Sequence, residues 1–175
     1  PSGKLPASFE YAIEDNPTYN YYFDNDEDLK VNYGEGLFVG YRYWDKNKNK
    51  PRFPFGYGLS YTSFNYSNLE SDKKEYKIGE KVKLNLSIKN TGNFIGSEIV
   101  QLYVSDKECS FVRPVKELKA FDKISLNINE AKKVEFELDQ NAFSFYNPET
   151  HSWEIEPGVF EILVGSNSSD IRETI

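Results

Sequence analysis

The sequence is poor in the residue types from which many protein sites are built. Its 175 residues include one cysteine, one histidine and no methionine. A single cysteine excludes a disulfide framework within the chain. His151 cannot hold a metal alone, and no Ser, Cys or second His stands at a spacing that would suggest a catalytic triad. We therefore expect no metal and no cofactor, with Cys109 and His151 as ordinary loop residues.

Positive charge and long apolar runs are also scarce. The chain carries 21 basic and 28 acidic residues, for a net charge of -7. This balance disfavours a nucleic-acid partner, which requires clustered Lys and Arg. No run approaches the roughly 20 apolar residues that span a bilayer. We expect neither a nucleic-acid nor a membrane partner. The turn-like Pro-Ser-Gly start and the lack of Met lead us to expect a fragment or a processed chain.

The composition changes sharply near residue 68. Residues 1–68 contain 17 of the 28 aromatic residues but only 7 Leu, Ile and Val. Residues 69–175 contain 26 Leu, Ile and Val. Small cores depend on aliphatic side chains that interdigitate, with aromatic rings in support. The first part is therefore predicted to be an extended arm that needs another surface to pack on.

Alternating hydrophobicity in the second part predicts a sheet protein. Val82, Leu84, Leu86 and Ile88 fall on one face of Glu80–Asn90, with polar residues between them. Period two over nine residues is a strong strand signal. Similar runs follow at Glu98–Val104, Val115–Phe121, Lys133–Leu138, Ser152–Ile155 and Val159–Val164. About seven strands without a convincing helix between them predict an all-β, antiparallel sandwich of the immunoglobulin-like class. Since the Cys…Trp…Cys pattern is absent, the fibronectin III-like variant is preferred.

The run FPFGYGLSYTSF at residues 53–64 combines five rings with two glycines. A potassium filter would need flanking membrane helices, and a phosphate loop would need glycine where Tyr61 stands, followed by a helix. A packed junction between domains is the remaining interpretation.

An acidic stretch fits part of a calcium-loop pattern. Asp24, Asp26 and Asp28 precede Glu35 at suitable spacing. Leu29 occupies the position that calcium loops give to glycine, and the flanks do not resemble amphipathic helices. A solvated acidic turn is the preferred interpretation.

Aromatic residues suggest one candidate binding region. The run Tyr41–Asp45 alternates rings with hydrogen-bonding groups. Sugars are often bound by rings that stack on C–H faces beside polar groups. Alternation along Leu37–Trp44 would equally place the rings in an interdomain contact. Arg42, Tyr43 and Trp44 are therefore candidates for residues near a substrate, with packing as the alternative.

Several motifs together resemble a known enzyme family. They are PSGKLP at 1–6, YGEGLFVGYRYWD at 33–45, FPFGYGLSYTSF at 53–64, NTGNFIGSEIVQLYVSD at 90–106, RPVKELKAF at 113–121 and EPGVFEILVGSNS at 156–168. In this order they are similar to the C-terminal portion of glycoside hydrolase family 3 enzymes of the β-glucosidase and β-xylosidase type. The resemblance covers nearly the whole chain.

The resemblance implies a role for each part of the chain. Residues 1–68 would be the end of an α/β-sandwich domain plus a connecting arm, and residues 69–175 a fibronectin III-like domain. The family's nucleophilic aspartate and acid/base glutamate would precede this chain, so no catalytic residue is assigned and the isolated chain should be inactive. Its partners would be the barrel and α/β-sandwich domains, which would bind the β-glycoside, and a homo-oligomer is possible.

Two other functions remain open from the sequence. A carbohydrate-binding module could use Tyr41, Tyr43, Trp44 and Trp153. A free-standing adhesion module of fibronectin type is disfavoured, because such modules do not carry an aromatic arm of this length.

Overall fold

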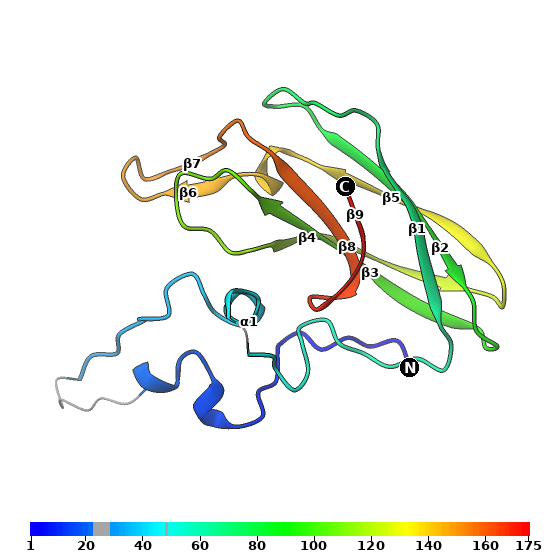
Figure 1. Cartoon of the computed structure of the whole chain (residues 1–175), viewed down its shortest axis with the longest axis horizontal. Coiled ribbons are helices and arrows are strands. Elements are labelled where there is room, and N and C mark those ends of the chain that lie inside the picture. The colour runs from blue at the N-terminus through cyan, green and yellow to red at the C-terminus, as the bar shows by residue number, and fades with distance from the viewer. Residues whose placement is uncertain (23–28, 48) are drawn as a thin grey trace.

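Two antiparallel sheets face each other, and a long irregular segment lies against the outside of one of them (Figure 1). The computed structural model describes residues 1–22, 29–47 and 49–175. One sheet has the strand order β1-β2-β5 and the other β4-β3-β8-β9, while β6 and β7 form a separate hairpin. The predicted all-β sandwich is confirmed.

The strands are β1 (Phe64–Ser71), β2 (Val82–Asn90), β3 (Gly96–Asp106), β4 (Glu117–Leu126), β5 (Ala131–Leu138), β6 (Phe145–Asn147), β7 (Ser152–Glu154), β8 (Phe160–Asn167) and β9 (Asp170–Thr174). The described helical segments are short: η1 (Ile13–Asp15), η2 (Tyr19–Tyr21), α1 (Tyr41–Lys46) and η3 (Gln140–Ala142). None of the helices in the described ranges is long and apolar enough to cross a membrane.

The core forms where the alternation of the sequence is clearest. On β2, the four predicted inward residues are buried, namely Val82, Leu84, Leu86 and Ile88. Leu86 lies opposite Val134 of β5, while the outward Lys83 lies opposite Glu137. Direct cross-strand neighbours are the pairs that stabilise a sheet. The register therefore places apolar pairs inside and opposite charges outside.

Strand β3 is buried on both faces. Its inward residues Val100, Leu102 and Val104 belong to the core between the sheets. Its alternate residues Gln101, Tyr103 and Ser105 are also buried, with exposures of 3%, 0% and 3%. Because successive strand side chains point to opposite faces, a second layer must cover the outer face. That layer is the segment before β1, residues 1–63, which we call the arm.

The sandwich begins earlier than the sequence suggested. Strand β1 starts at Phe64, and the rings of Phe64 and Tyr66 join the core with Leu69. The alternation was hidden because the strand is irregular: Asn68 has a φ of 57° and the pairing with β2 shifts between Ser67 and Glu70. The short strands β6 and β9 were also missed.

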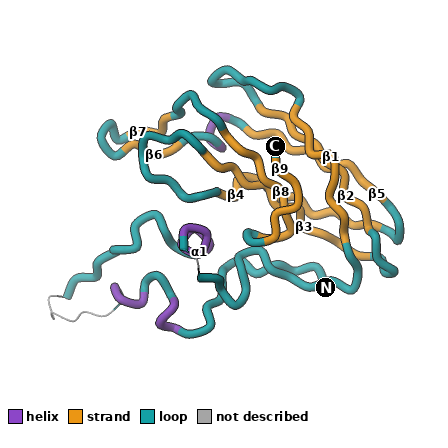
Figure 2. The backbone as a smooth tube through the Cα atoms, viewed as in Figure 1, coloured by secondary structure: helices purple, strands orange, loops and turns teal. Residues whose placement is uncertain are grey.

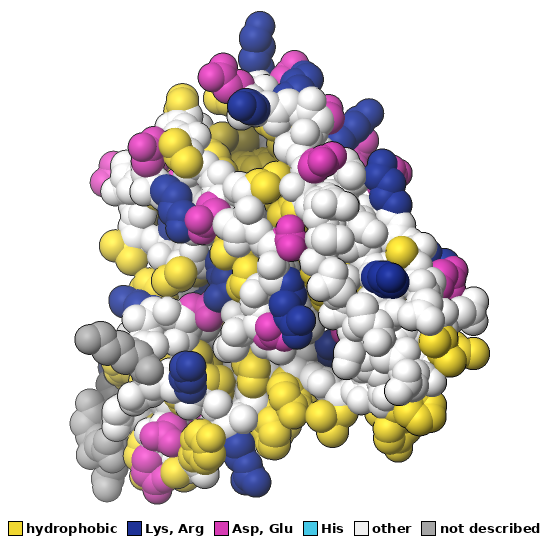
Figure 3. Space-filling view, turned by 45° about the vertical axis from the view of Figure 1, so that its right-hand side comes forward, with side chains coloured by type: hydrophobic (Ala, Val, Ile, Leu, Met, Phe, Trp, Pro, Cys, Tyr) yellow, Lys and Arg dark blue, Asp and Glu magenta, His cyan; other side chains and the backbone are white. Residues whose placement is uncertain are grey.

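The two ends of the sandwich differ. At the end away from the arm, a cavity of about 1020 Å³ opens between the sheets. It is visible as an apolar recess near the top of the space-filling view (Figure 3). Its apolar lining includes Tyr76, Val82, Phe143, Phe160 and Ile162. Near the arm, regular structure gives way to loops that run across the second sheet (Figure 2).

Candidate functional site: the seam between arm and sandwich

The two ends of the arm pair with each other beside the sandwich. Leu5 N donates to the carbonyl of Tyr57 and Gly56 N donates to the carbonyl of Leu5, both at 2.8 Å. Phe9 and Phe53 form an antiparallel bridge through two further backbone bonds. The PSGKLP and FPFGYG motifs are therefore one structural unit, although about 50 residues separate them. We call the contact between the arm and the β4-β3-β8-β9 sheet the seam.

Gly56 allows the closest approach of the arm to the sheet. Its φ is 80°, and a Cβ at this position would overlap the side-chain amide of Gln101. That amide is fully used: Nε2 donates to the carbonyl of Ser166 at 2.7 Å, and Oε1 accepts from the Tyr103 hydroxyl at 2.6 Å. Ser168 N also donates to the carbonyl of Phe55 at 2.9 Å. Glycine here serves both the left-handed backbone and the tight contact.

Helix α1 attaches the middle of the arm to β3 and β4. The ring of Tyr41 stacks on Phe55 with centroids 4.9 Å apart and meets Tyr103 edge-on at 6.0 Å. Its hydroxyl accepts a 2.9 Å hydrogen bond from Leu118 N. Tyr41 therefore contacts a ring of the arm and a ring of the sandwich, and its hydroxyl accepts a hydrogen bond from a backbone N–H of β4.

Ion pairs connect α1 to the segment that leads into β4. Arg42 Nη2 lies 2.9 Å from Glu117 Oε1, and Lys116 Nζ lies 2.6 Å from Asp45 Oδ2. The YRYWD and RPVKELK motifs thus face each other. Lys116 is 8% exposed, and charged groups are rarely so buried unless they are paired.

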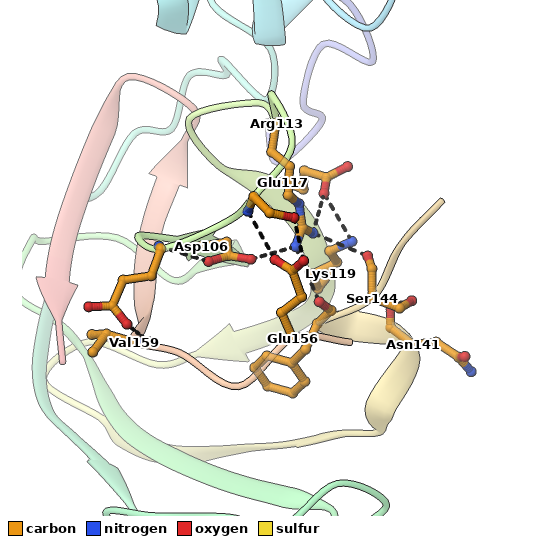
Figure 4. Close-up of polar contacts among 11 residues, drawn as sticks. Asp106, Arg113, Glu117, Lys119, Asn141, Ser144, Glu156 and Val159 are labelled. Carbon is orange, nitrogen blue, oxygen red and sulfur yellow. Dashed lines mark hydrogen bonds and ion pairs between the residues drawn. The ribbon is translucent and has the colours of Figure 1, made fainter. Parts of the chain in front are cut away.

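Arg113 organises the other side of this cluster (Figure 4). Its guanidinium lies 2.8 Å from Asp106 Oδ2 and 3.3 Å from Glu117 Oε2. It also donates to the carbonyls of Phe143 and Ser144, at 3.2 and 3.1 Å. Arginine can supply several fixed donors at once. The loop between β3 and β4 is thereby held against the segment before β6.

Two acidic residues of the seam, Asp45 and Glu117, have opposite pKa shifts. Burial raises the pKa of Asp45, and the hydrogen bond and charge of Lys116 only partly oppose it. Burial also acts to raise the pKa of Glu117, but Lys119, Arg42 and Arg113 outweigh it and the net pKa is lowered. Glu117 is therefore held as a carboxylate by three cations, which suits a structural role.

The candidate residues from the sequence lie on α1, which replaces the predicted alternation of Leu37–Trp44. Arg42 is engaged with Glu117. Trp44 is only 9% exposed, and the ring of Tyr43 meets it edge-on at 5.3 Å. Trp153 lies elsewhere, on β7, and is 70% exposed. The first three are consecutive on α1, where Arg42 contacts the sandwich, and Trp153 lies apart from them.

The sequence patterns assigned no role to the sandwich residues that contact the arm or brace that contact, which are Gln101, Tyr103, Arg113, Lys116 and Glu117. Two signals could have found them: the polar residues alternating with the apolar ones of β3, and the charges within RPVKELK. Asp24, Asp26 and Asp28 lie outside the described residues. No cluster of three or more His, Cys, Asp and Glu suited to a metal occurs within the described ranges.

Comparison with known proteins identifies the family context. Residues 98–168 match the fibronectin type III-like domain. The chain is 48% identical to thermostable β-glucosidase B of Acetivibrio thermocellus, over 98% of the chain and 22% of that protein. It is 41% identical to a β-glucosidase of Bacteroides ovatus, over 100% of the chain and 24% of that protein.

A solved structure agrees with these relatives. The family 3 β-glucosidase of Bifidobacterium adolescentis superposes with a TM-score of 0.91 at 34% identity, covering 100% of this chain and 25% of that one. The chain thus spans about a quarter of the length of the proteins it matches. Over its full length it corresponds to one part of the β-glucosidases of glycoside hydrolase family 3, the part that contains their fibronectin type III-like domain.

Proposed function

We propose that this chain is the C-terminal, non-catalytic part of a β-glucosidase whose other domains hydrolyse the substrate. The observation that carries the proposal is the full-length match to about a quarter of such enzymes. A retaining glycosidase needs two carboxylates about 5–5.5 Å apart. The buried carboxylates of the seam are instead paired with Lys and Arg. The catalytic pair would belong to the domains that precede this chain.

The outer side of the arm supports a docking role. Many of its large apolar residues are exposed by 39% or more: Phe9, Tyr11, Ile13, Tyr21, Tyr22, Leu29, Val31, Tyr33, Leu37, Val39, Leu59 and Tyr61. Exposed apolar surface of this extent is typical of an interface. Residues 1–68 would comprise the end of an α/β-sandwich domain and the connecting arm, with the last five residues already in β1. The arm would then join the sandwich to the barrel and α/β-sandwich domains.

Arg42, Tyr43 and Trp44 would lie near the substrate of the whole enzyme. Their helix follows Leu37 and Val39, which are 54% and 41% exposed. Because Trp44 is buried and Arg42 is paired with Glu117, these residues would act by fixing the arm at the rim of the site. In the isolated chain, the same exposed surface would favour pairing of two copies, which light scattering after size-exclusion chromatography would detect.

A chimaera tests the proposed function. The matching 171 residues of the Acetivibrio thermocellus protein are replaced by this chain, and hydrolysis of an aryl β-glucoside is measured. We expect activity from the chimaera and none from the chain alone. Hydrolysis by the chain alone would disprove the non-catalytic assignment. Unchanged activity and melting temperature after removal of residues 64–175 would disprove the structural role.

A further inference from the structure

The hairpin of β6 and β7 presents two rings that serve neither the core nor the seam. Tyr146 lies directly opposite Trp153 in the pairing of the two strands. The rings meet edge to face, with centroids 5.8 Å apart and an angle of 71°. Tyr146 is 49% exposed and Trp153 70% exposed, whereas the neighbouring Phe145 and Asn147 are buried. One face of the hairpin, with Phe145 and Asn147, is therefore turned inward, and the other face, with Tyr146 and Trp153, is exposed to solvent.

The aromatic face is held rigidly. Phe145 packs on Phe111, with centroids 5.3 Å apart, beneath the guanidinium of Arg113. Asn147 Nδ2 donates to Glu154 Oε2 across the strands at 2.9 Å. Ser152 and Thr150 also donate to Glu154. A ring presented by a braced hairpin loses little conformational freedom when it binds a partner.

The chemistry around the rings narrows the class of partner. Residues 147–156 contain three glutamates and neither Lys nor Arg, which disfavours a polyanion. Two rings of about 150–250 Å² each fall well short of the roughly 800 Å² per side of a stable protein interface. The Tyr146 hydroxyl and the Trp153 indole N–H have no hydrogen-bond partner in the described part of the chain. The face therefore offers apolar stacking beside free polar groups.

That combination matches a saccharide. In a β-linked glucose unit the hydroxyls are equatorial, so axial C–H groups cover both faces of the ring and can stack on an indole. The hydroxyls at the rim can then bond with the phenol and with the indole N–H. Tyr146 supports Trp153 from one side, which leaves the remainder of the indole available.

We propose that Tyr146 and Trp153 form a surface site for β-linked gluco-oligosaccharides, separate from the site of hydrolysis. The choice of a β-linked glucose polymer rests on the proposed function, whereas stacking on the rings does not. The site would hold the substrate chain near the enzyme. With one or two stacked units, a dissociation constant on the order of 1 mM is expected.

Tryptophan fluorescence tests the site directly, because the chain has only two tryptophans and Trp44 is buried. Cellotetraose is titrated into the 175-residue chain, and acrylamide quenching is measured with and without the sugar. We expect a saturable emission change and protection of Trp153 from quenching. Maltotetraose, which is α-linked, should give at least fivefold weaker binding. No saturable change, or equal binding of both sugars, would overturn the proposal.

Variants assign the binding to the rings. Trp153→Ala and Tyr146→Ala should each weaken binding at least tenfold. Because Trp153→Ala loses the fluorescent reporter, binding to both variants is measured by NMR from the backbone chemical shifts of the hairpin. Tyr61→Ala removes an 80% exposed ring far from the hairpin in sequence and should leave binding unchanged. Equal loss in all three variants, or none in the first two, would overturn the assignment. Hydrolysis by the chimaera is measured separately, so failure of binding and failure of the proposed function are distinguishable.

Discussion

The sandwich and the arm use aromatic residues in opposite ways. In the sandwich, the inward-facing aliphatic residues of β2 and β3 are between 0% and 7% exposed, and the rings of Phe64, Tyr66 and Phe136 join them in one core. The arm is richer in rings, yet only Trp44 and Gly56 are buried among its described residues. Aromatic content alone therefore does not predict a core. The sandwich stabilises itself, whereas the arm is ordered by the surface that it covers.

The largest expected effect is a loss of stability on substitution of a core residue, compared with substitution of an exposed ring in the arm. Leu86→Ala removes a side chain that is 1% exposed and should lower the free energy of unfolding by about 3 kcal/mol, through lost burial and a cavity. Tyr33→Ala, at an 81% exposed ring, should change it by less than about 0.5 kcal/mol. Urea denaturation measures both values. Similar losses would show that the arm has a core of its own.

A second comparison concerns the closest contact within the seam. Gly56→Ala should cost about 2 kcal/mol, since it adds left-handed strain and an overlap with Gln101. Gly36 also has a positive φ, of 56°, but a Cβ there would meet no atom within 4 Å. Gly36→Ala should cost no more than about 1 kcal/mol. Limited proteolysis should cut the arm faster only in the first variant; equal rates would show that the contact with Gln101 does not hold the arm.

The sandwich was largely predictable because its signal is local. Period-two alternation found β2, β3, β4, β5, β7 and β8 to within a few residues. Strand β1 was missed because a bulge near Asn68 interrupts the alternation and its rings resembled the arm. Strands β6 and β9 have three and five residues that do not alternate clearly, whereas the equally short β7 lies in the alternating run Ser152–Ile155.

The seam was less predictable because its pairs are distant in sequence. The sequence indicated a packed junction between domains at FPFGYGLSYTSF; the structure shows Gly56 of this run against Gln101 of the sandwich, and the contact with further domains stays a prediction. It could not indicate that Tyr41 meets Leu118, or Asp45 meets Lys116, since no local pattern relates residues more than 70 positions apart. Helix α1 was missed because six residues following Gly40 carry too little helical periodicity.

A smaller effect is expected from one hydroxyl of the seam. Tyr41→Phe keeps the ring on Phe55 but removes the acceptor for Leu118 N. Loss of one hydrogen bond to a partly buried donor should cost about 1 kcal/mol. Tyr43→Phe is the matched control, because its hydroxyl has no hydrogen-bond partner in the described ranges. Amide exchange should accelerate at Leu118 in the first variant; unchanged exchange in both would contradict the role of the hydroxyl.

The smallest expected effect is a change in the pH dependence of stability, with opposite sign for substitutions at Glu117 and at Asp45. Glu117 has a lowered pKa in the folded chain, so the unfolded chain binds more protons below its ordinary value of 4.5. Its contribution to stability is present above that pH and is lost as the pH falls through the folded pKa. Glu117→Gln should therefore flatten the loss of stability on acidification.

Asp45 should behave in the reverse way. The pKa of Asp45 in the folded chain is raised above the ordinary 3.8, so the folded chain retains this proton to a higher pH than the unfolded chain does. The stabilisation from that proton is complete below pH 3.8 and is lost as the pH rises through the folded pKa. Asp45→Asn should therefore make stability fall more steeply on acidification, because it removes a group that opposes the fall. Urea titrations between pH 3 and 7 measure both slopes. Slopes that change in the same direction would show that Lys116 outweighs burial at Asp45, and that the whole seam is held by charge.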